Sequence, residues 1–256
     1  MFENKFVVFK WAFRDFFTKE IVMPKVFGWE HITYLIIFLV IAIASLVLAK
    51  IFLKERKWQV LYIKVVAGLA LLSNILCRIF VAIKDSNISH AFPYTICSLT
   101  SLLLPLAVLL GKENSNLYQG LWYLGLVGGL GTMLYPDFIG QNASVFYSCT
   151  ITGLLHHSFD FLLCLAMWVF GWFRPNLKKC YFFPMIFCGY ITVGAFAQHV
   201  LEINGSMLIT KSVLEGTPIN CWFILFVGTI LIALFSLVYE LIKKKCEKKQ
   251  VVESKE

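Results

Sequence analysis

Seven long apolar runs occupy most of the chain and limit what it can fold into. They cover residues 31–53, 58–83, 92–111, 117–135, 150–173, 181–201 and 218–242. A helix needs about 20 apolar residues to cross the hydrocarbon core of a bilayer, at a rise of roughly 1.5 Å per residue. Because every run reaches about that length, the sequence predicts an all-α, polytopic transmembrane helical bundle of about seven spans.

Composition excludes a water-soluble domain and a nucleic-acid partner. The 256 residues are 59% hydrophobic and only 15% charged, with a mean hydropathy of +0.76. The net charge of +8 does not mark a nucleic-acid surface, because the basic residues form short clusters between the apolar runs. We expect these clusters to contact anionic membrane lipids and to set the topology.

The sequence predicts one membrane domain with two flanking segments. Residues 1–30 interleave aromatic and basic side chains and predict an interfacial amphipathic helix, 31–242 form the bundle, and 243–256 form a basic tail. No cleavable signal peptide is expected. Lys and Arg collect in alternate loops and in the tail, which places the C-terminus of a cell-membrane protein in the cytoplasm. The basic N-terminal segment then lies outside, against the same rule, and one crossing fewer would remove that conflict.

Small residues inside the runs are assigned to packing. The fourth run carries a stripe of four glycines, Gly125, Gly128, Gly129 and Gly131, which lets a neighbouring helix approach closely. The eight cysteines include no CxxC pair. They are therefore expected to be mainly small buried hydrophobic residues rather than disulfides or metal ligands, and no cofactor is predicted.

Polar and ionisable side chains inside the runs give the clearest indication of function. An ionisable group costs about 2.5–3.5 kcal/mol at the centre of a span, so it usually faces a cavity. In the predicted topology all five histidines fall in the outer half of the membrane. The sequence therefore predicts an outward-facing cavity. Its expected substrate-binding residues are Arg78, Asn74, His31, Thr95, Asp137 and His199.

The fifth run contains His156, His157 and Asp160. On a helix, Asp160 lies on the same face as either imidazole, because it follows them by four and three residues. Its carboxylate could orient a histidine, as the third member of a nucleophile arrangement does. The alternative is a hydrogen bond that only packs helices, and both interpretations remain open at this point.

Cys97 follows Pro93 in the third run. Proline starts a helix well, so we expect Cys97 about one turn inside a helix, where the positive helix end favours a thiolate. Most membrane cysteines are inert, and this position alone does not make the thiol a nucleophile. The histidines have no tight metal-binding spacing such as HExxH, so no metal site is predicted.

Four short motifs occur in order along the chain, at residues 27–31, 92–97, 122–137 and 156–157. They read Phe-Gly-Trp-Glu-His, Phe-Pro-Tyr-Thr-Ile-Cys, a Gly-rich stretch from Trp-Tyr-Leu-Gly to Tyr-Pro-Asp, and His-His. Together they resemble the YwaF-like family of bacterial integral membrane proteins, which is distantly related to eukaryotic multi-span acyltransferases acting on ether phospholipids. The chain departs from the family at Thr95, where the family usually has histidine.

The resemblance implies a reaction and a catalytic pair. In the related acyltransferases the proposed pair is a cysteine and a histidine, which correspond here to Cys97 and to His157 or His156. The first hypothesis is a lipid acyltransferase in which Cys97 attacks an acyl ester and His157 moves the proton. Asp160 would orient the imidazole and Arg78 would hold a lipid phosphate. The partners are membrane lipids, including an acyl-lipid substrate.

Two other functions stay open. A cavity containing Arg78, Asp160 and histidines would also suit a transporter of a small anionic or proton-coupled solute, although the sequence shows no inverted repeat. A third interpretation is a non-catalytic membrane assembly subunit whose polar residues only pack helices.

Overall fold

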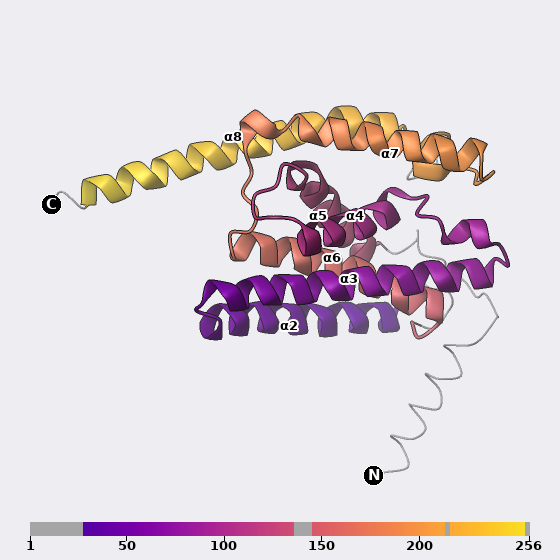
Figure 1. Ribbon diagram of the computed structural model, residues 1–256, viewed down its shortest axis with the longest axis horizontal. Helices are drawn as coiled ribbons and strands as arrows, with labels where there is room; N and C mark the ends of the chain where they lie inside the picture. The colour runs from indigo at the N-terminus through magenta and orange to yellow at the C-terminus, as the bar shows by residue number, and fades with distance from the viewer. Residues whose placement is uncertain (1–27, 136–144, 213–215, 254–256) are drawn as a thin grey trace, which may run out of the picture.

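The computed structural model describes residues 28–135, 145–212 and 216–253, and within them the chain is helical (Figure 1). The α-helices are α2 (Trp29–Phe52), α3 (Arg56–Lys84), α4 (Ile96–Leu110), α5 (Tyr118–Leu134), α6 (Ser148–Val169), α7 (Phe182–His199) and α8 (Cys221–Glu253). Short 3-10 helices are η1 (Ile88–Ala91), η3 (Leu177–Lys179) and η4 (Ser206–Leu208). Almost all of the segment predicted to form an interfacial helix, residues 1–30, lies outside the described residues.

These seven α-helices of the described chain coincide with the seven predicted runs, which confirms the all-α bundle. The stretches long and apolar enough to cross a bilayer are Trp29–Phe52, Arg56–Lys84, Ser148–Val169, Leu177–His199 and Cys221–Glu247. The other two helices are shorter than a full crossing of about 20 residues, with 15 residues in α4 and 17 in α5. The short helices are those at the centre of the bundle, beside the cavity described below.

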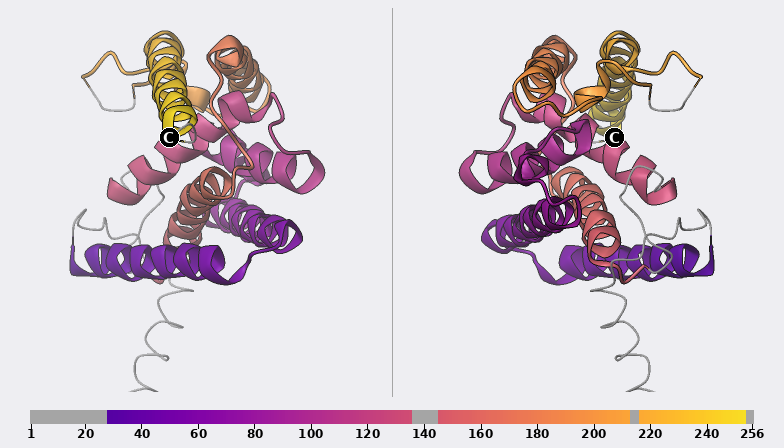
Figure 2. Two further views of the ribbon diagram at one scale, coloured as in Figure 1. Left: turned by 90° about the vertical axis from the view of Figure 1, so that its left-hand side faces the viewer. Right: turned by 90° about the vertical axis from the view of Figure 1, so that its right-hand side faces the viewer.

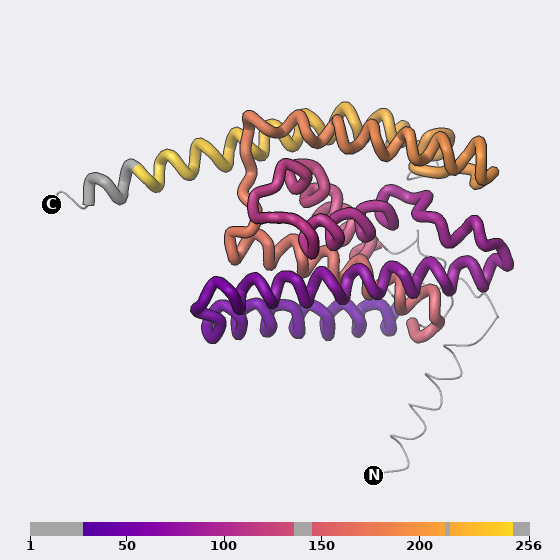
Figure 3. The backbone as a smooth tube through the Cα atoms, viewed as in Figure 1, coloured from indigo at the N-terminus to yellow at the C-terminus, as the bar shows by residue number. Residues whose placement is uncertain are grey.

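The helices form three tiers (Figure 1). In the end views of Figure 2, α2 and α3 lie on one side, α7 and α8 lie on the other, and α4, α5 and α6 lie between them. The tube in Figure 3 shows the chain crossing back and forth along the long axis, with α8 continuing beyond the bundle toward the C-terminus. Helix α6 makes its most extensive contacts with α3 and α5, so it is the central element of the fold.

The outer tiers present apolar side chains to their surroundings. Ile36 and Val40 on α2 and Phe226 and Leu234 on α8 are all more than half exposed. A soluble protein would bury side chains of this size, whereas hydrocarbon solvates them. The exposed apolar surfaces are therefore those expected of a protein whose outer helices lie in a membrane.

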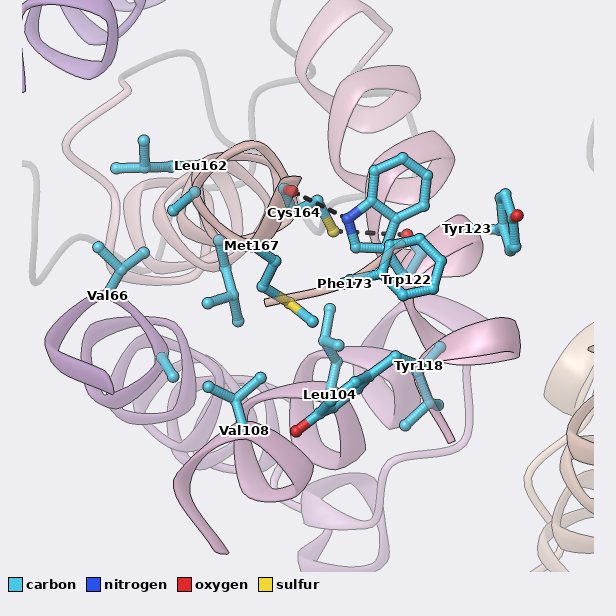
Figure 4. Packing of buried hydrophobic residues seen from close by; sticks show 14 of the residues in the cluster. Val66, Leu104, Val108, Tyr118, Trp122, Tyr123, Leu162, Cys164, Met167 and Phe173 are labelled. Atoms are coloured by element: carbon cyan, nitrogen blue, oxygen red, sulfur yellow. Dashed lines mark hydrogen bonds between the residues drawn. The ribbon is translucent and has the colours of Figure 1, made fainter. Parts of the chain in front are cut away.

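Aromatic packing fills the end of the bundle where α5 begins and α6 ends (Figure 4). The ring of Trp122 stacks on Phe173 at a centroid distance of 4.8 Å and lies 5.2 Å from the ring of Trp168. Its indole nitrogen donates a 2.8 Å hydrogen bond to the carbonyl oxygen of Cys164, so the buried N–H is satisfied. These contacts lock α5 onto α6 at this end.

A charged network closes the same end from outside the apolar core. Arg56 at the start of α3 makes a bidentate pair with Glu113 in the α4–α5 loop, with nitrogen–oxygen distances of 2.6 and 3.0 Å. The guanidinium also donates to the carbonyl oxygen of Phe170, at the C-terminus of α6. One side chain therefore ties together the ends of three helices.

Some glycines of the predicted stripe allow a neighbouring helix to approach closely, and others do not. A Cβ atom on Gly129 would lie 2.7 Å from the carbonyl oxygen of His157 and 3.0 Å from the amide nitrogen of Phe161, both backbone atoms of α6. A Cβ atom on Gly131 would meet nothing within 4 Å. Close approach of α5 to α6 therefore depends on Gly129 and not on Gly131.

We expect Gly129→Ala to lower the stability of the protein by about 1–3 kcal/mol, because backbone atoms cannot move aside for the methyl group. Gly131→Ala is the matched control in the same helix. It should be neutral or slightly stabilising, since alanine is favoured over glycine in a helix by roughly 1 kcal/mol. Thermal unfolding of both variants in the same detergent checks this, and equal losses would contradict it.

Candidate functional site

A cavity of about 660 Å³ lies at the end of the bundle opposite the aromatic packing. Its walls come from the end of α3, the start of α4, the second half of α5, the first half of α6, the η4 turn and the start of α8. The polar and cysteine residues that line it are Cys77, Arg78, Lys84, Asp85, Tyr94, Thr95, Cys97, Ser98, Thr132, Cys149, His156 and His157. The structure therefore brings Arg78, Thr95, Cys97, His156 and His157 together, as predicted from their similar depth.

Two non-helical segments form part of the cavity wall. One contains Tyr94, just before α4, and the other contains Met207 in η4. The amide N–H of Met207 donates a 2.9 Å hydrogen bond to the carbonyl oxygen of Tyr94, which joins the two segments. Irregular backbone is tolerated at membrane depth only where it is buried in protein or lines a cavity, because hydrocarbon cannot satisfy its polar groups.

Cys97 is the second residue of α4, because the helix starts later than the sequence predicted. Pro93 does not begin the helix, and Thr95 caps it instead. The Ser98 amide donates to the Thr95 hydroxyl at 3.1 Å, and the Thr95 amide donates to the Ser98 hydroxyl at 3.1 Å. This capping box satisfies two donors at once and fixes the start of α4. Thr95 thus holds the helix that carries Cys97.

The first turn of α4 leaves two backbone donors at the cavity. The amides of Ile96 and Cys97 precede the first intrahelical hydrogen bond, which the Leu99 amide donates to the Thr95 carbonyl at 3.0 Å. Both residues line the cavity. Amides at a helix start carry partial positive charge and bind developing anions.

The two histidines of α6 are buried and in contact, with ring centroids 4.0 Å apart and ring planes tilted by 35°. His156 Nδ1 lies 3.0 Å from the hydroxyl oxygen of Ser101, and that hydroxyl donates to Asp160. The prediction that Asp160 orients an imidazole therefore needs a correction, because the carboxylate reaches His156 through Ser101. Sequence reasoning missed Ser101; the hydroxyl cluster from Ser98 to Ser101 in an apolar run was the available signal.

Arg78 projects from α3 to the cavity with most of its hydrogen-bonding capacity unused. Its Nε and Nη1 atoms are buried and have no hydrogen-bond partner, and Nη2 makes only a 3.7 Å contact with the sulfur of Cys77. The guanidinium lies 5.7 Å from the ring centre of Tyr94. Buried donors without partners are costly, so this side chain is suited to a ligand with anionic oxygens. Lys84 adds a second cation to the wall.

Two predicted site residues, His31 and His199, do not line the cavity, and a third lies outside the described residues. His31 is buried in the first turn of α2, where Nε2 donates a 2.8 Å hydrogen bond to the Met133 carbonyl and ties α2 to the end of α5. His199 is the exposed last residue of α7. Asp137 lies outside the described residues.

Asn74 supports the site without lining the cavity. Its side-chain amide on α3 donates a 3.1 Å hydrogen bond to the Ser98 carbonyl, so it holds α3 against the first turn of α4. The substrate-binding role predicted for Asn74 becomes, in the structure, a packing role next to Cys97.

The cysteines fall into three groups by exposure: buried, partly exposed (Cys97 and Cys180) and exposed. Cys77, Cys149, Cys164 and Cys221 are buried, as predicted, whereas Cys188 and Cys246 are exposed. Cys97 is partly exposed at the cavity wall. A thiol that faces a cavity differs from one packed in a core, because a ligand can reach it.

Comparison with known families matches most of the chain. The family model described as the TMEM164 family matches residues 26–239, the stretch that contains the cavity. No curated protein and no solved structure matches the chain. The likeness to the YwaF-like family and its relation to acyltransferases stay predictions.

We expect Thr95→Ala to lower stability by about 1 kcal/mol, because the Ser98 amide loses the Thr95 hydroxyl that accepts its hydrogen bond. Thr95→Ser keeps the hydroxyl and is the matched variant, which should behave like the parent. Thermal unfolding in detergent measures the difference. An unchanged melting temperature for Thr95→Ala would show that the cap does not hold α4.

Proposed function

The chain belongs to the TMEM164 family of membrane proteins, and on that premise we propose that it transfers acyl chains between membrane lipids, with Cys97 as the nucleophile. One observation carries this proposal: the thiol of Cys97, the imidazoles of His156 and His157 and the unpartnered guanidinium of Arg78 line the same cavity. The resemblance described above implies the same cysteine and histidine pair.

The cavity suits an acyl lipid. Apolar side chains, among them Leu124, Val127 and Ile224, share the lining with the polar residues. A volume of about 660 Å³ is in the range of small-molecule sites, which combine apolar walls with a few placed polar groups. Methylene groups of an acyl chain would pack against the apolar wall while the ester reaches the polar groups.

The chemistry is a two-step exchange. An imidazole of the His156–His157 pair takes the proton of the Cys97 thiol, and the thiolate sulfur attacks the ester carbonyl carbon of the donor lipid. The carbon–sulfur bond forms, the ester carbon–oxygen bond breaks, and the imidazolium returns its proton to the leaving alkoxide. In the second step the acceptor hydroxyl gives its proton to the imidazole while its oxygen attacks the thioester. The new ester forms and the thiolate is released.

Two sets of hydrogen-bond donors in the cavity bind negatively charged oxygen atoms of the substrate in this proposal. The amides of Ile96 and Cys97 stabilise the oxyanion of each tetrahedral intermediate, since they lie next to the attacking sulfur. The guanidinium of Arg78, whose Nε and Nη1 donors have no partner in the described part of the chain, holds a lipid phosphate. The substrate is thereby fixed at its headgroup and at its reacting ester.

The closed end of the bundle favours an enzyme over a transporter. A transporter needs access to its site from both faces of the membrane. Here the packing of Trp122, Phe173 and Trp168 fills the end opposite the cavity, and the pair of Arg56 with Glu113 covers it. An assembly subunit, in turn, gives no reason for the unpartnered donors of Arg78.

The proposed orientation places the reaction at the outer leaflet. Ile224, near the start of α8, lines the cavity, whereas the basic tail lies at the other end of the same helix. A cytoplasmic C-terminus, as the basic loops predict, therefore puts the cavity in the outer half of a cell membrane.

Cys97→Ala should abolish acyl exchange between phospholipids in reconstituted vesicles, because the nucleophile is lost. Wild-type protein incubated with radiolabelled acyl lipid should form a hydroxylamine-sensitive thioester on Cys97. Cys188→Ala, which changes an exposed cysteine of α7, is the matched control and should retain exchange. Exchange that survives Cys97→Ala would refute the assignment of the nucleophile.

Arg78→Gln should raise KM for the phospholipid by about 10-fold or more, since a charge-assisted hydrogen bond contributes roughly 1.5–3 kcal/mol. Arg78→Lys keeps the charge but loses the planar fork, so an intermediate KM is expected. Steady-state kinetics of the three proteins in mixed micelles separate KM from kcat. A fall in kcat with KM unchanged would contradict phosphate binding by this residue.

A further inference from the structure

We propose that Ser101 is a positioning residue that selects His156, rather than His157, as the imidazole that moves protons in the cavity. The catalytic part of this inference rests on the proposed acyl transfer. Its structural part, the tautomer of His156, can be tested without activity.

When Asp160 is ionised, the hydrogen-bond geometry fixes the tautomer of His156. A serine hydroxyl carries one hydrogen, and that of Ser101 is donated to the carboxylate of Asp160. The 3.0 Å contact of Ser101 Oγ with His156 Nδ1 must then use a hydrogen on Nδ1. In the neutral ring, Nε2 therefore carries the lone pair. Because His156 lines the cavity, this nitrogen is the one available to accept a proton there.

His157 lacks this support. It also lines the cavity, yet within the described residues its ring makes no hydrogen bond and only packs, tilted, against His156 at 4.0 Å. Without a fixed tautomer the ring has no preferred donor or acceptor nitrogen. Two protonated rings at this separation would repel strongly, so one imidazole serves as the base and the other packs against it.

Asp160 compensates the charge that the reaction creates. When His156 accepts a proton from Cys97, its new positive charge lies near the positive charge of Arg78 on α3 and against the ring of His157. The carboxylate of Asp160, linked through Ser101, is the anion joined to it by hydrogen bonds. Asp160 Oδ1 is buried without a partner, a costly arrangement that helix packing alone does not explain.

Ser101 itself is excluded as a nucleophile. Its side chain is 0% exposed and does not line the cavity, whereas Cys97 does. A substrate can therefore reach the thiol but not this hydroxyl. The role left for Ser101 is to hold the ring and pass on its hydrogen bond.

The test measures the His156 tautomer by nitrogen-15 NMR of histidine-labelled protein in nanodiscs, with the signals assigned through His156→Gln. We expect a protonated Nδ1 in the wild type and a mixture of tautomers in Ser101→Ala, which removes one oxygen atom. Ser158→Ala is the matched control, because this buried α6 hydroxyl bonds Tyr34 at 2.9 Å and not a histidine. It should leave the His156 signals unchanged.

Kinetics of the same variants test the catalytic part. Ser101→Ala should lower kcat about 10- to 100-fold, less than the roughly 100- to 10,000-fold of a complete loss of general acid–base catalysis, with KM nearly unchanged. Asp160→Asn, an isosteric second variant, should lower kcat and move the acidic limb of the pH–rate profile to lower pH, because the imidazolium loses its counter-charge.

The outcomes separate this inference from the proposed function. An unchanged His156 tautomer in Ser101→Ala, or a wild-type ring protonated on Nε2, would overturn the positioning role whatever the activity. If wild-type protein forms no Cys97 thioester but the tautomer depends on Ser101 as expected, the acyl-transfer proposal fails while the assignment of the His156 contact stands. Loss of kcat in His157→Gln but not in His156→Gln would overturn the selection of His156.

Discussion

The polar side chains of α6 each need a partner or a cavity, because lipid surrounds the bundle and hydrocarbon satisfies no hydrogen bond. Ser158 meets the hydroxyl of Tyr34 from α2, and Asp160 and His156 share the hydroxyl of Ser101 from α4. These contacts point in different directions around one helix. They therefore set the rotation of α6, and that rotation decides which of its side chains reach the cavity.

The two ends of the bundle differ: tightly packed helix ends close one, and irregular backbone lines the cavity at the other. Stacked rings around Trp122 and the pair of Arg56 with Glu113 close one end. At the other end the chain leaves helical geometry before α4 and in η4, where the Met207 amide bonds the Tyr94 carbonyl. Short central helices and irregular backbone create space that continuous helices would fill. The site is thus a consequence of where the helices stop.

Much of the candidate site was predictable from depth alone. The apolar runs fix the height of each residue in the membrane, so Arg78, Cys97 and His156 could be grouped at one level. Height does not fix the direction in which a side chain points. His31 belongs to the same level, yet it bonds the Met133 carbonyl between two helices instead of lining the cavity. Ser101 was overlooked because serine and threonine hydroxyls in an apolar run cost little, so they stand out less than ionisable groups do.

The sequence by itself determined the solvent, the helices and their order, because hydropathy over about 20 residues decides whether a segment enters lipid. It also indicated which residues share a depth. Only the tertiary structure decided that Thr95 rather than Pro93 starts α4, that Asp160 contacts His156 through Ser101, and that the cavity and the aromatic core lie at opposite ends of the bundle. These features depend on the rotation and close packing of helices distant in sequence, which apolar runs of similar length and composition leave free.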